Sequence, residues 1–431
     1  MGLFTSPHLR SVRERIQINN QPLSESLFSK YFFDIWDRLS ATGDGSKPAY
    51  FRFLTLVAFH TFLQERVDTA VIECGIGGEY DSTNILVSPT TTAVTALGID
   101  HVGMLGGTIA EIAWHKGGIF KKGAPAFTVL QPEPAMDVLR KRAEERDTTL
   151  QLVKRHPQIA NGEVKLGLAA DFQKSNASLA VAVTAAHLHA VGHNFVPNPS
   201  EINEQELPVE FRRGLEQVKW PGRCEMRREV RNGIAWCLDG GHTLESIEVA
   251  GQWFAEEVQT LQQSNAGINH HSQRPRILIF NQQTRDAAGL ARALFNTLSA
   301  VLGQNPFTHV IFTTNVTFKD AGYKPDLVAM NNNAEEVQTL KVQKELAAMW
   351  VELDPVADIK VAATIEDAIN EVRILARQVN IEETNELVVF ITGSLHLVGG
   401  VLEILESSGV KDEVDGTFSK SIACHKPALA K

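Results

Sequence analysis

The sequence predicts a two-domain α/β protein in which each domain is a parallel β-sheet covered by helices. The chain has 431 residues, which is long for a single hydrophobic core. Short apolar runs rich in β-branched residues alternate with amphipathic helical patterns, and that alternation is typical of parallel sheets. The run Lys219-Trp-Pro-Gly-Arg223 interrupts it, because proline and glycine disfavour both patterns. We therefore expect a first domain at 1–219, a linker at 220–223, a second domain at 224–410 and a loosely held tail at 411–431.

The composition is that of an ordinary globular protein and argues against several classes of function. Apolar residues make up 43% of the chain and charged residues 21%. The formal net charge of −10 disfavours nucleic acid as the main partner, because a phosphate backbone needs a basic surface. The sequence has no apolar stretch long enough to span a membrane. The four cysteines lack C-x-x-C spacing, so we expect reduced thiols in a cytosol-like compartment.

In the first domain, two helices should precede a series of strands. Ser24 can cap an amphipathic helix whose apolar face runs from Leu27 to Leu39, and a second helix is expected at 51–66. The strand Thr69–Glu73 follows and leads into a glycine-rich loop. The other elements expected in this domain are strands at 92–97, 124–129 and 150–153, and helices beginning near 107 and covering 134–146, 175–189 and 200–215.

The middle of the first domain places polar groups at the end of a buried strand. The apolar run Thr92–Leu97 has the composition of a parallel strand, and Asp100 and His101 follow it. In open α/β sheets ligands bind at the carboxyl ends of the strands, so these two side chains should face a ligand site. The helix that comes next carries Lys116 near its end.

Glu73 and His101 each end a predicted strand. If those strands are parallel neighbours, the carboxylate and the imidazole reach the same edge of the sheet, where they suit a divalent cation. A Glu–His hydrogen bond that only fixes two loops accounts for the same spacing equally well. The sequence alone leaves both interpretations open.

The glycine-rich loop after Glu73 is not a dinucleotide-binding fingerprint. It runs Gly75-Ile-Gly-Gly-Glu-Tyr80, so a tyrosine stands where G-x-G-x-x-G requires its third glycine. A nicotinamide-dependent oxidoreductase is therefore disfavoured.

The second domain also ends its predicted strands in polar residues. Strands are expected near 234–239, 276–281, 309–313, 359–362 and 387–392, with helices between them, which makes a doubly wound sheet. Asp239 ends one of these strands, and helix N-termini near Thr243 and Ser394 are natural anion sites, although both residues could serve only as caps. Arg223 in the linker is free to reach a phosphate.

Seven segments of the chain, taken in order, resemble the folylpolyglutamate synthases of the Mur ligase superfamily, and specifically their eukaryotic form. They are Thr5-Ser-Pro-His-Leu9 with Val12-Arg-Glu-Arg15; Glu73-Cys-Gly-Ile-Gly-Gly78 with Tyr80-Asp81 and Thr83-Asn84; Gly98-Ile-Asp-His101; Ile112-Ala-Trp-His-Lys-Gly-Gly-Ile-Phe-Lys121; Trp220-Pro-Gly-Arg223; Leu238-Asp-Gly-Gly-His-Thr243; and Thr392-Gly-Ser-Leu-His-Leu-Val-Gly-Gly400. Together they cover nearly the whole chain. The resemblance implies a P-loop-NTPase-like first domain of the Mur ligase central-domain type and a Rossmann-like second domain.

The resemblance also implies an ATP-dependent, γ-linked addition of L-glutamate to tetrahydrofolate or its polyglutamates through an acyl phosphate. ATP and Mg²⁺ are the implied cofactors, a monovalent cation is compatible, and a monomer in the cytoplasm or mitochondria is expected.

By position, Ser6, Glu73 and His101 match the Mg²⁺ ligands of the family, and Arg223 and Asp239 match its ATP contacts. His242 should lie near the incoming glutamate, and Lys116 matches a lysine that is carbamylated in bacterial relatives. An unmodified Lys116 that pairs with an acid is the alternative.

One family motif is missing from the printed residues. The family has a phosphate-binding loop of the form G-x-x-x-x-G-K-S on its first strand, upstream of the segment that matches Thr5–Leu9, and no such loop occurs in this sequence. We therefore expect the first sheet to lack one strand and the polypeptide as printed to have little or no ligase activity. A shortened gene model or a late-starting isoform would explain the difference.

Two rival functions remain open at this point. Dihydrofolate synthase shares the Gly98-Ile-Asp-His101 and Lys-Gly-Gly-Ile segments. From a different class, the chain could be a non-catalytic fragment that binds folate or protein partners.

Overall fold

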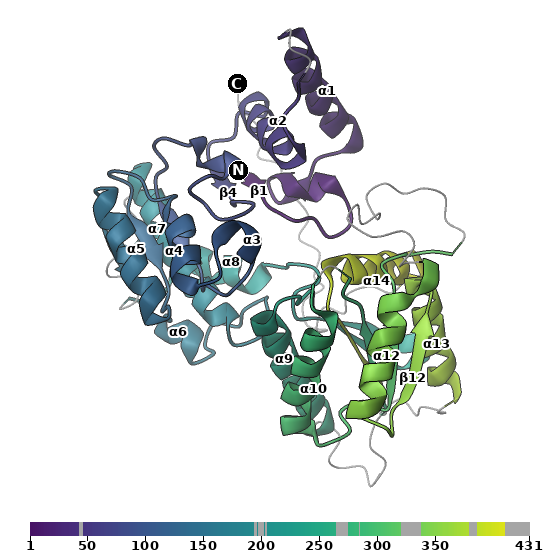
Figure 1. Ribbon diagram of the computed structural model, residues 1–431. Helices are drawn as coiled ribbons and strands as arrows, with labels where there is room; N and C mark the ends of the chain where they lie inside the picture. The colour runs from purple at the N-terminus through teal and green to yellow at the C-terminus, as the bar shows by residue number, and fades with distance from the viewer. Residues whose placement is uncertain are drawn as a thin grey trace, which may run out of the picture.

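The protein is described here from a computed structural model, which covers residues 1–42, 46–193, 196, 202, 205–263, 275–283, 285–319, 338–378 and 386–409. The described chain forms two lobes, joined at the segment that follows α8 (Figure 1). The expected tail at 411–431 lies outside the described residues. None of the helices in the described ranges is long and apolar enough to cross a membrane.

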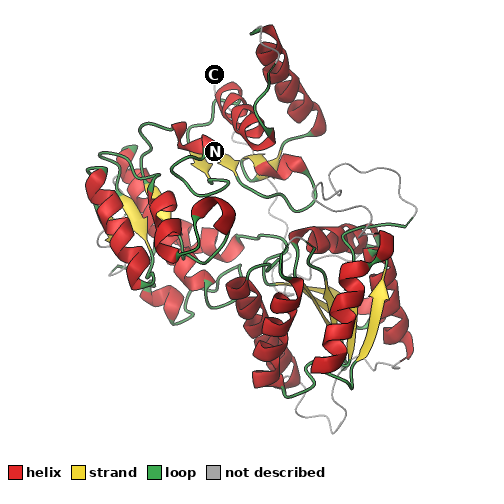
Figure 2. Cartoon of the chain, viewed as in Figure 1, coloured by secondary structure: helices red, strands yellow, loops and turns green. Residues whose placement is uncertain are grey.

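The first lobe combines short strands with helices of very different lengths (Figure 2). Its strands are β1 (Gly2–Phe4), β2 (Ile16–Ile18), β3 (Gln21–Pro22), β4 (Ala70–Ile72), β5 (Thr92–Val94), β6 (Ala126–Thr128) and β7 (Leu150–Leu152). Its helices are α1 (Glu25–Ala41), α2 (Tyr50–Gln64), α3 (Val102–Leu105), α4 (Ile109–Gly117), α5 (Glu133–Glu145), α6 (Pro157–Ala160), α7 (Gln173–Ala190) and α8 (Val209–Gln217), with 3₁₀ turns at Val12–Arg15 and Ser82–Ile85.

Local sequence explains where several of these helices begin. Ser24 caps α1, because its hydroxyl accepts a hydrogen bond from the Leu27 amide at 3.2 Å, as the sequence predicts. The helix expected at 200–215 instead begins, among the described residues, at Val209. Pro208 precedes it, and a proline is tolerated at the start of a helix but not in its interior.

The strands of the first lobe form two sheets rather than one. The first has the order β3-β2-β1-β4, with β1 parallel to β4 and antiparallel to β2. The second is parallel and has the order β5-β6-β7. Within the described residues β4 and β5 are not paired. The imidazole of His187 on α7 instead hydrogen-bonds to a threonine just before each strand, with Nε2 3.0 Å from Thr69 Oγ1 and Nδ1 2.9 Å from Thr90 Oγ1. The α/β class expected for this lobe is confirmed, and its strands divide between one mixed and one parallel sheet.

The second lobe is the doubly wound sheet that the sequence predicts. Its strands, β8 (Glu225–Glu229), β9 (Ile234–Leu238), β10 (Arg276–Phe280), β11 (His309–Thr313), β12 (Asp358–Ala362) and β13 (Leu387–Thr392), have the order β12-β11-β10-β13-β9-β8. All neighbours are parallel except β8, which runs antiparallel to β9. Its helices are α9 (Leu244–Gln263), α10 (Ala287–Leu302), α12 (Lys341–Leu353), α13 (Ile365–Gln378) and α14 (Leu395–Ser407).

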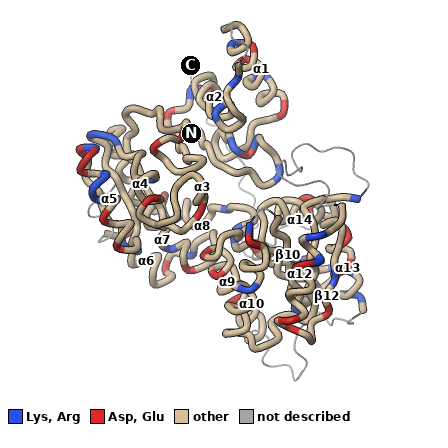
Figure 3. The backbone as a smooth tube through the Cα atoms, in the orientation of Figure 1, with Lys and Arg blue, Asp and Glu red and all other residues tan. Residues whose placement is uncertain are grey.

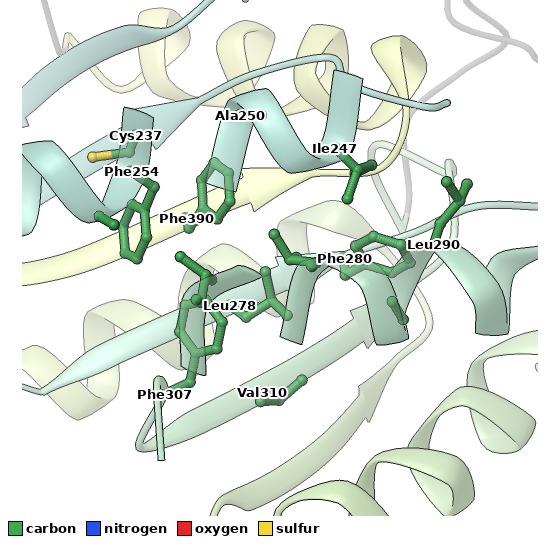
Figure 4. Packing of buried hydrophobic residues seen from close by; sticks show 14 of the residues in the cluster. Cys237, Ile247, Ala250, Phe254, Leu278, Phe280, Leu290, Phe307, Val310 and Phe390 are labelled. Carbon is green, nitrogen blue, oxygen red and sulfur yellow. The ribbon is translucent and has the colours of Figure 1, made fainter. Parts of the chain in front are cut away.

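Two apolar clusters hold this sheet between its helices. Side chains of α9, α10 and α12 pack on one face, where Phe254 stacks on Phe390 with ring centroids 4.5 Å apart (Figure 4). Side chains of α13 and α14 pack on the other face. Because strands β9, β10 and β13 are buried on both faces, their carboxyl ends are fixed in position.

Candidate functional site

The first two candidate residues meet at the carboxyl ends of β1 and β4. Phe4 on β1 is opposite Ile72 on β4, so the parallel pairing brings the residues that follow each strand to the same edge. The Ser6 amide donates a hydrogen bond to Glu73 Oε2 at 2.8 Å. The structure thus brings together Ser6 and Glu73, two of the three predicted metal ligands.

Glu73 lies in a partly desolvated, positively charged environment. Burial raises the pKa of its carboxyl group, because water no longer stabilises the charged form. The hydrogen bond from Ser6 opposes that shift, as do the positive charges of Arg223, Lys116 and Arg15. Lys116 and Arg223, both predicted site residues, are therefore close enough to Glu73 to act on it.

His101 follows β5, which belongs to a different sheet from β4, so strand pairing does not bring it to Glu73. Because β4 and β5 belong to separate sheets, the premise that placed Glu73 and His101 on adjoining strands is wrong. His101 Nε2 lies 3.7 Å from Asp100 Oδ2. Its backbone has a φ of 53°, a left-handed conformation that costs a non-glycine residue about 1–2 kcal/mol and often marks functional sites.

Asp100 connects this region to the second lobe. Its Oδ1 lies 2.7 Å from Arg285 Nη1, and both side chains are partly exposed. One residue earlier, the Ile99 amide donates to Glu245 Oε1 of α9 at 3.2 Å. Sequence reasoning did not identify Arg285 as a site residue, because no motif contains it and only the folded chain brings it to Asp100.

His242 lies beside this contact, on the second lobe. Burial lowers the pKa of its imidazole, and the charges of Arg285 and Arg223 lower it further, while Asp100 opposes them. Its Nδ1 is 2.8 Å from the Gly240 carbonyl oxygen. A carbonyl can only accept a hydrogen bond, so Nδ1 carries the hydrogen and Nε2 presents a lone pair in the neutral ring.

Asp239 ties the linker to the end of β9. It is buried, and its Oδ1 accepts the Gly241 amide at 2.8 Å while its Oδ2 accepts the Cys224 amide at 2.9 Å. Burial raises the pKa of this carboxyl group, and the charge of Arg223 opposes the shift. These bonds fix Cys224 in a left-handed conformation, with a φ of 47°, directly after Arg223. Asp239 thus positions the arginine that the sequence predicts as an ATP contact.

The glycine-rich loop packs against the last turn of α4, which carries Lys116. A Cβ added to Gly78 would lie 2.7 Å from the His115 carbonyl oxygen and 2.9 Å from that of Lys116. The Glu79 amide donates to the His115 carbonyl oxygen at 2.7 Å, and the Glu79 carboxylate pairs with Arg142 and Arg146 of the next helix region. The Lys116 side chain makes no hydrogen bond or close ion pair with the described residues.

Arg223 connects the separate parts of the site. Its charge acts on Glu73 in the first lobe and on Asp239 and His242 in the second. Basic and acidic residues are interspersed along both lobes (Figure 3). The described residues contain no group of three or more His, Cys, Asp or Glu side chains that could hold a metal ion, so a cation here needs hydroxyl, water or substrate ligands as well.

Comparison with known proteins gives consistent results. A family model described as "Dihydrofolate synthetase, C-terminal domain" matches residues 222–404. The folylpolyglutamate synthase of Saccharomyces cerevisiae (strain FostersO) is 46% identical over 424 residues, which cover 95% of this chain and 72% of that protein.

Solved structures are similar over the same range. Folylpolyglutamate synthase of Mycobacterium tuberculosis, solved with ADP and AMPPCP, is 25% identical with a TM-score of 0.66, over 94% of this chain and 84% of that one. The apo enzyme of L. casei is 21% identical with a TM-score of 0.63, over 94% and 83%. The two-lobed fold is therefore that of these enzymes, and the chain belongs to the folylpolyglutamate synthase family.

Proposed function

We propose that the protein uses ATP to join L-glutamate to the γ-carboxylate of tetrahydrofolate or a tetrahydrofolate polyglutamate, releasing ADP and phosphate. The observation that carries the proposal is the Ser6–Glu73 pair at the carboxyl ends of β1 and β4, whose carboxylate also feels the positive charges of Lys116 and Arg223. Such a reaction needs a phosphoryl donor, a carboxylate acceptor and an amine to meet between two domains that exclude water. The relative that is 46% identical supports the same activity by its name.

The Ser6–Glu73 pair fits the chemistry of Mg²⁺. The ion prefers oxygen ligands and is usually held in nucleotide sites by one or two carboxylates together with phosphates and water. Glu73 uses Oε2 for the Ser6 amide, and its Oε1 makes no hydrogen bond with the described residues. The Ser6 hydroxyl and this oxygen would hold the ion, which would neutralise charge on the transferred phosphoryl group. His101 as a third ligand stays a prediction.

His242 is suited to move a proton. Its Nδ1 donates to the Gly240 carbonyl, so its neutral Nε2 can accept the proton that the glutamate amine loses when it attacks the activated carboxylate. A pKa lowered by burial keeps the ring neutral near pH 7. Arg223 would contact the phosphates, and Asp239 would fix its position through Cys224.

A product assay tests the proposal. The protein is incubated with ATP, Mg²⁺ and labelled glutamate, with tetrahydrofolate in one reaction and dihydropteroate in the other. We expect tetrahydrofolate to gain glutamate with equimolar ADP release and dihydropteroate to remain unchanged. Product from dihydropteroate alone would instead assign the protein as a dihydrofolate synthase, the activity that the description of the matching family model suggests. No product from either would favour a non-catalytic role.

Two further points are decided separately. Intact-protein and peptide mass spectrometry shows whether Lys116 carries a carbamate, which adds the mass of CO₂, and the unmodified lysine is the other outcome. Size-exclusion chromatography with light scattering tests the expected monomer.

A further inference from the structure

The segment Thr5–Ser11, here called the bridging loop, connects the Ser6–Glu73 pair to the second lobe. It leaves the end of β1 and carries Ser6 near one end and Leu9 near the other. The Leu9 side chain packs against the apolar cluster that α13 and α14 form on the second-lobe sheet. A residue of the first lobe thus contributes to the core of the second.

The contact between Leu9 and α14 is a close backbone approach. A Cβ added to Gly399 would lie 2.1 Å from the Leu9 carbonyl oxygen, so only glycine allows the loop to lie this near the helix. A Cβ added to Gly222 in the linker would lie 3.3 Å from the Leu9 methyl groups. The next residue, Arg10, pairs with Glu406 of α14. The loop is therefore packed against α14 through both apolar and charged contacts.

The bridging loop is also fixed from within the first lobe. The Glu14 carboxylate accepts hydrogen bonds from the amides of Leu9 at 2.8 Å, Arg10 at 3.1 Å and Ser11 at 2.9 Å. Arg15 donates from Nε to His8 Nδ1 at 2.9 Å. Because one carboxylate holds three successive amides, Leu9, Arg10 and Ser11 are fixed as a unit.

We propose that Leu9 and Glu14 are positioning residues, through which the docking of α14 on the bridging loop sets the position of Ser6 relative to Glu73. The contacts follow one another along the bridging loop. Leu9 packs against α14, and Glu14 accepts hydrogen bonds from the amides of Leu9 to Ser11. Ser6, three residues before Leu9, donates its amide to Glu73. The arrangement of the two lobes and the geometry of the metal-binding pair are thereby coupled. The consequence for Mg²⁺ rests on the proposed function, whereas the coupling itself does not.

Hydrogen exchange tests the coupling without any substrate. The amide of Ser6 is followed by mass spectrometry in fragments that end before Leu9, in the original chain and in Gly399→Ala, with Gly214→Ala as the matched control. Gly214 has open space around the position of its Cβ. We expect Ser6 to exchange about tenfold faster in Gly399→Ala and unchanged in the control. Faster exchange confined to α14, with Ser6 unchanged, would overturn the proposal.

Substitution of Leu9 separates positioning from simple packing. We expect Leu9→Ala to expose the Ser6 amide as Gly399→Ala does, and Leu9→Met to restore its protection, because methionine keeps the volume in contact with α14. In the glutamate-addition assay, Leu9→Ala should raise the Mg²⁺ concentration that gives half the maximal rate about tenfold and leave the KM for folate unchanged. Equal changes in both constants, or a Leu9→Met variant as defective as Leu9→Ala, would show a general structural role and contradict the proposal. If the assay detects no activity, the exchange experiment still decides the coupling.

Discussion

The carboxylate of Asp100 and the guanidinium of Arg285, 185 positions apart in the sequence, form an ion pair that joins the two lobes. Neighbouring Ile99 and Glu245 add a hydrogen bond across the same boundary. The charges of Asp100 and Arg285 both act on the pKa of His242, so this ion pair lies beside the candidate site. It therefore links the arrangement of the lobes to the electrostatics of the candidate base.

The strength of this ion pair can be measured with a double-mutant cycle of Asp100→Asn and Arg285→Gln. Both side chains are 30% exposed, so we expect a coupling energy of about 0.5–1 kcal/mol, typical of partly solvated pairs. Hydrogen bonding to Arg285 holds the pKa of Asp100 below its ordinary value against the opposing effect of burial. The coupling should therefore be complete above the ordinary aspartate pKa and disappear as the pH falls through the lowered value. Unfolding curves in urea at several pH values measure it, and a coupling that does not change with pH would contradict this explanation.

Glu73 should be far more important for activity than an exposed carboxylate. We expect Glu73→Gln to reduce the rate of glutamate addition by about a hundredfold or more, because an amide retains the shape but not the charge that holds Mg²⁺. Glu133→Gln on α5 is the control, since the Glu133 side chain is 79% exposed. Initial rates at saturating substrate compare the three proteins. Similar rates for Glu73→Gln and the control would exclude Glu73 as a metal ligand.

His242 should make the protein less stable in mild acid. Its pKa is lowered in the folded state, so as the pH falls through the ordinary histidine value the unfolded chain gains a proton that the folded chain does not. His242→Gln removes this difference. We therefore expect the variant to be more stable, relative to the original chain, at pH 5.5 than at pH 8. If the difference between the two proteins is the same at both pH values, the histidine is not desolvated as described.

Gly78 should not tolerate a side chain. A Cβ added to Gly78 would lie within 3 Å of two backbone carbonyl oxygens in α4. The backbone cannot move aside as a flexible side chain can. We expect Gly78→Ala to destabilise the protein by about 1–3 kcal/mol, as overpacking typically does. Gly103→Ala is the control, because nothing lies within 4 Å of that position. Thermal unfolding compares the two variants, and equal midpoints would show that the loop is not packed against α4 as described.

Local sequence predicts the second lobe well and the first lobe only in part. The apolar runs of β9, β10 and β13 are long and buried on both faces, so their pattern alone identifies a doubly wound sheet. The strands of the first lobe are only two or three residues long, and nothing in their composition indicates that β4 and β5 lie in different sheets. Strand ends did not identify Ser6, which only the family resemblance placed with Glu73, and the structure joins the two because β1 and β4 are parallel neighbours.

The remaining features depend on contacts between distant segments. Arg285 meets Asp100, and Leu9 packs against α14, only once both lobes have folded. Each is an ordinary residue in its local sequence, an arginine in a polar loop and a leucine after a histidine. Periodicity and motif spacing describe neighbours along the chain, so they cannot identify residues whose partners lie in the other lobe. The close approach at Gly399 likewise gives no local signal apart from the glycine itself.

The position of the bound metal tests the central claim most directly. Crystals of the protein grown with Mn²⁺ and a non-hydrolysable ATP analogue would be measured at the manganese absorption edge. The account predicts an anomalous peak within bonding distance of the Ser6 hydroxyl and the Glu73 carboxylate, with the nucleotide phosphates beside Arg223. A peak away from Glu73, or phosphates bound without contact to Arg223, would contradict it.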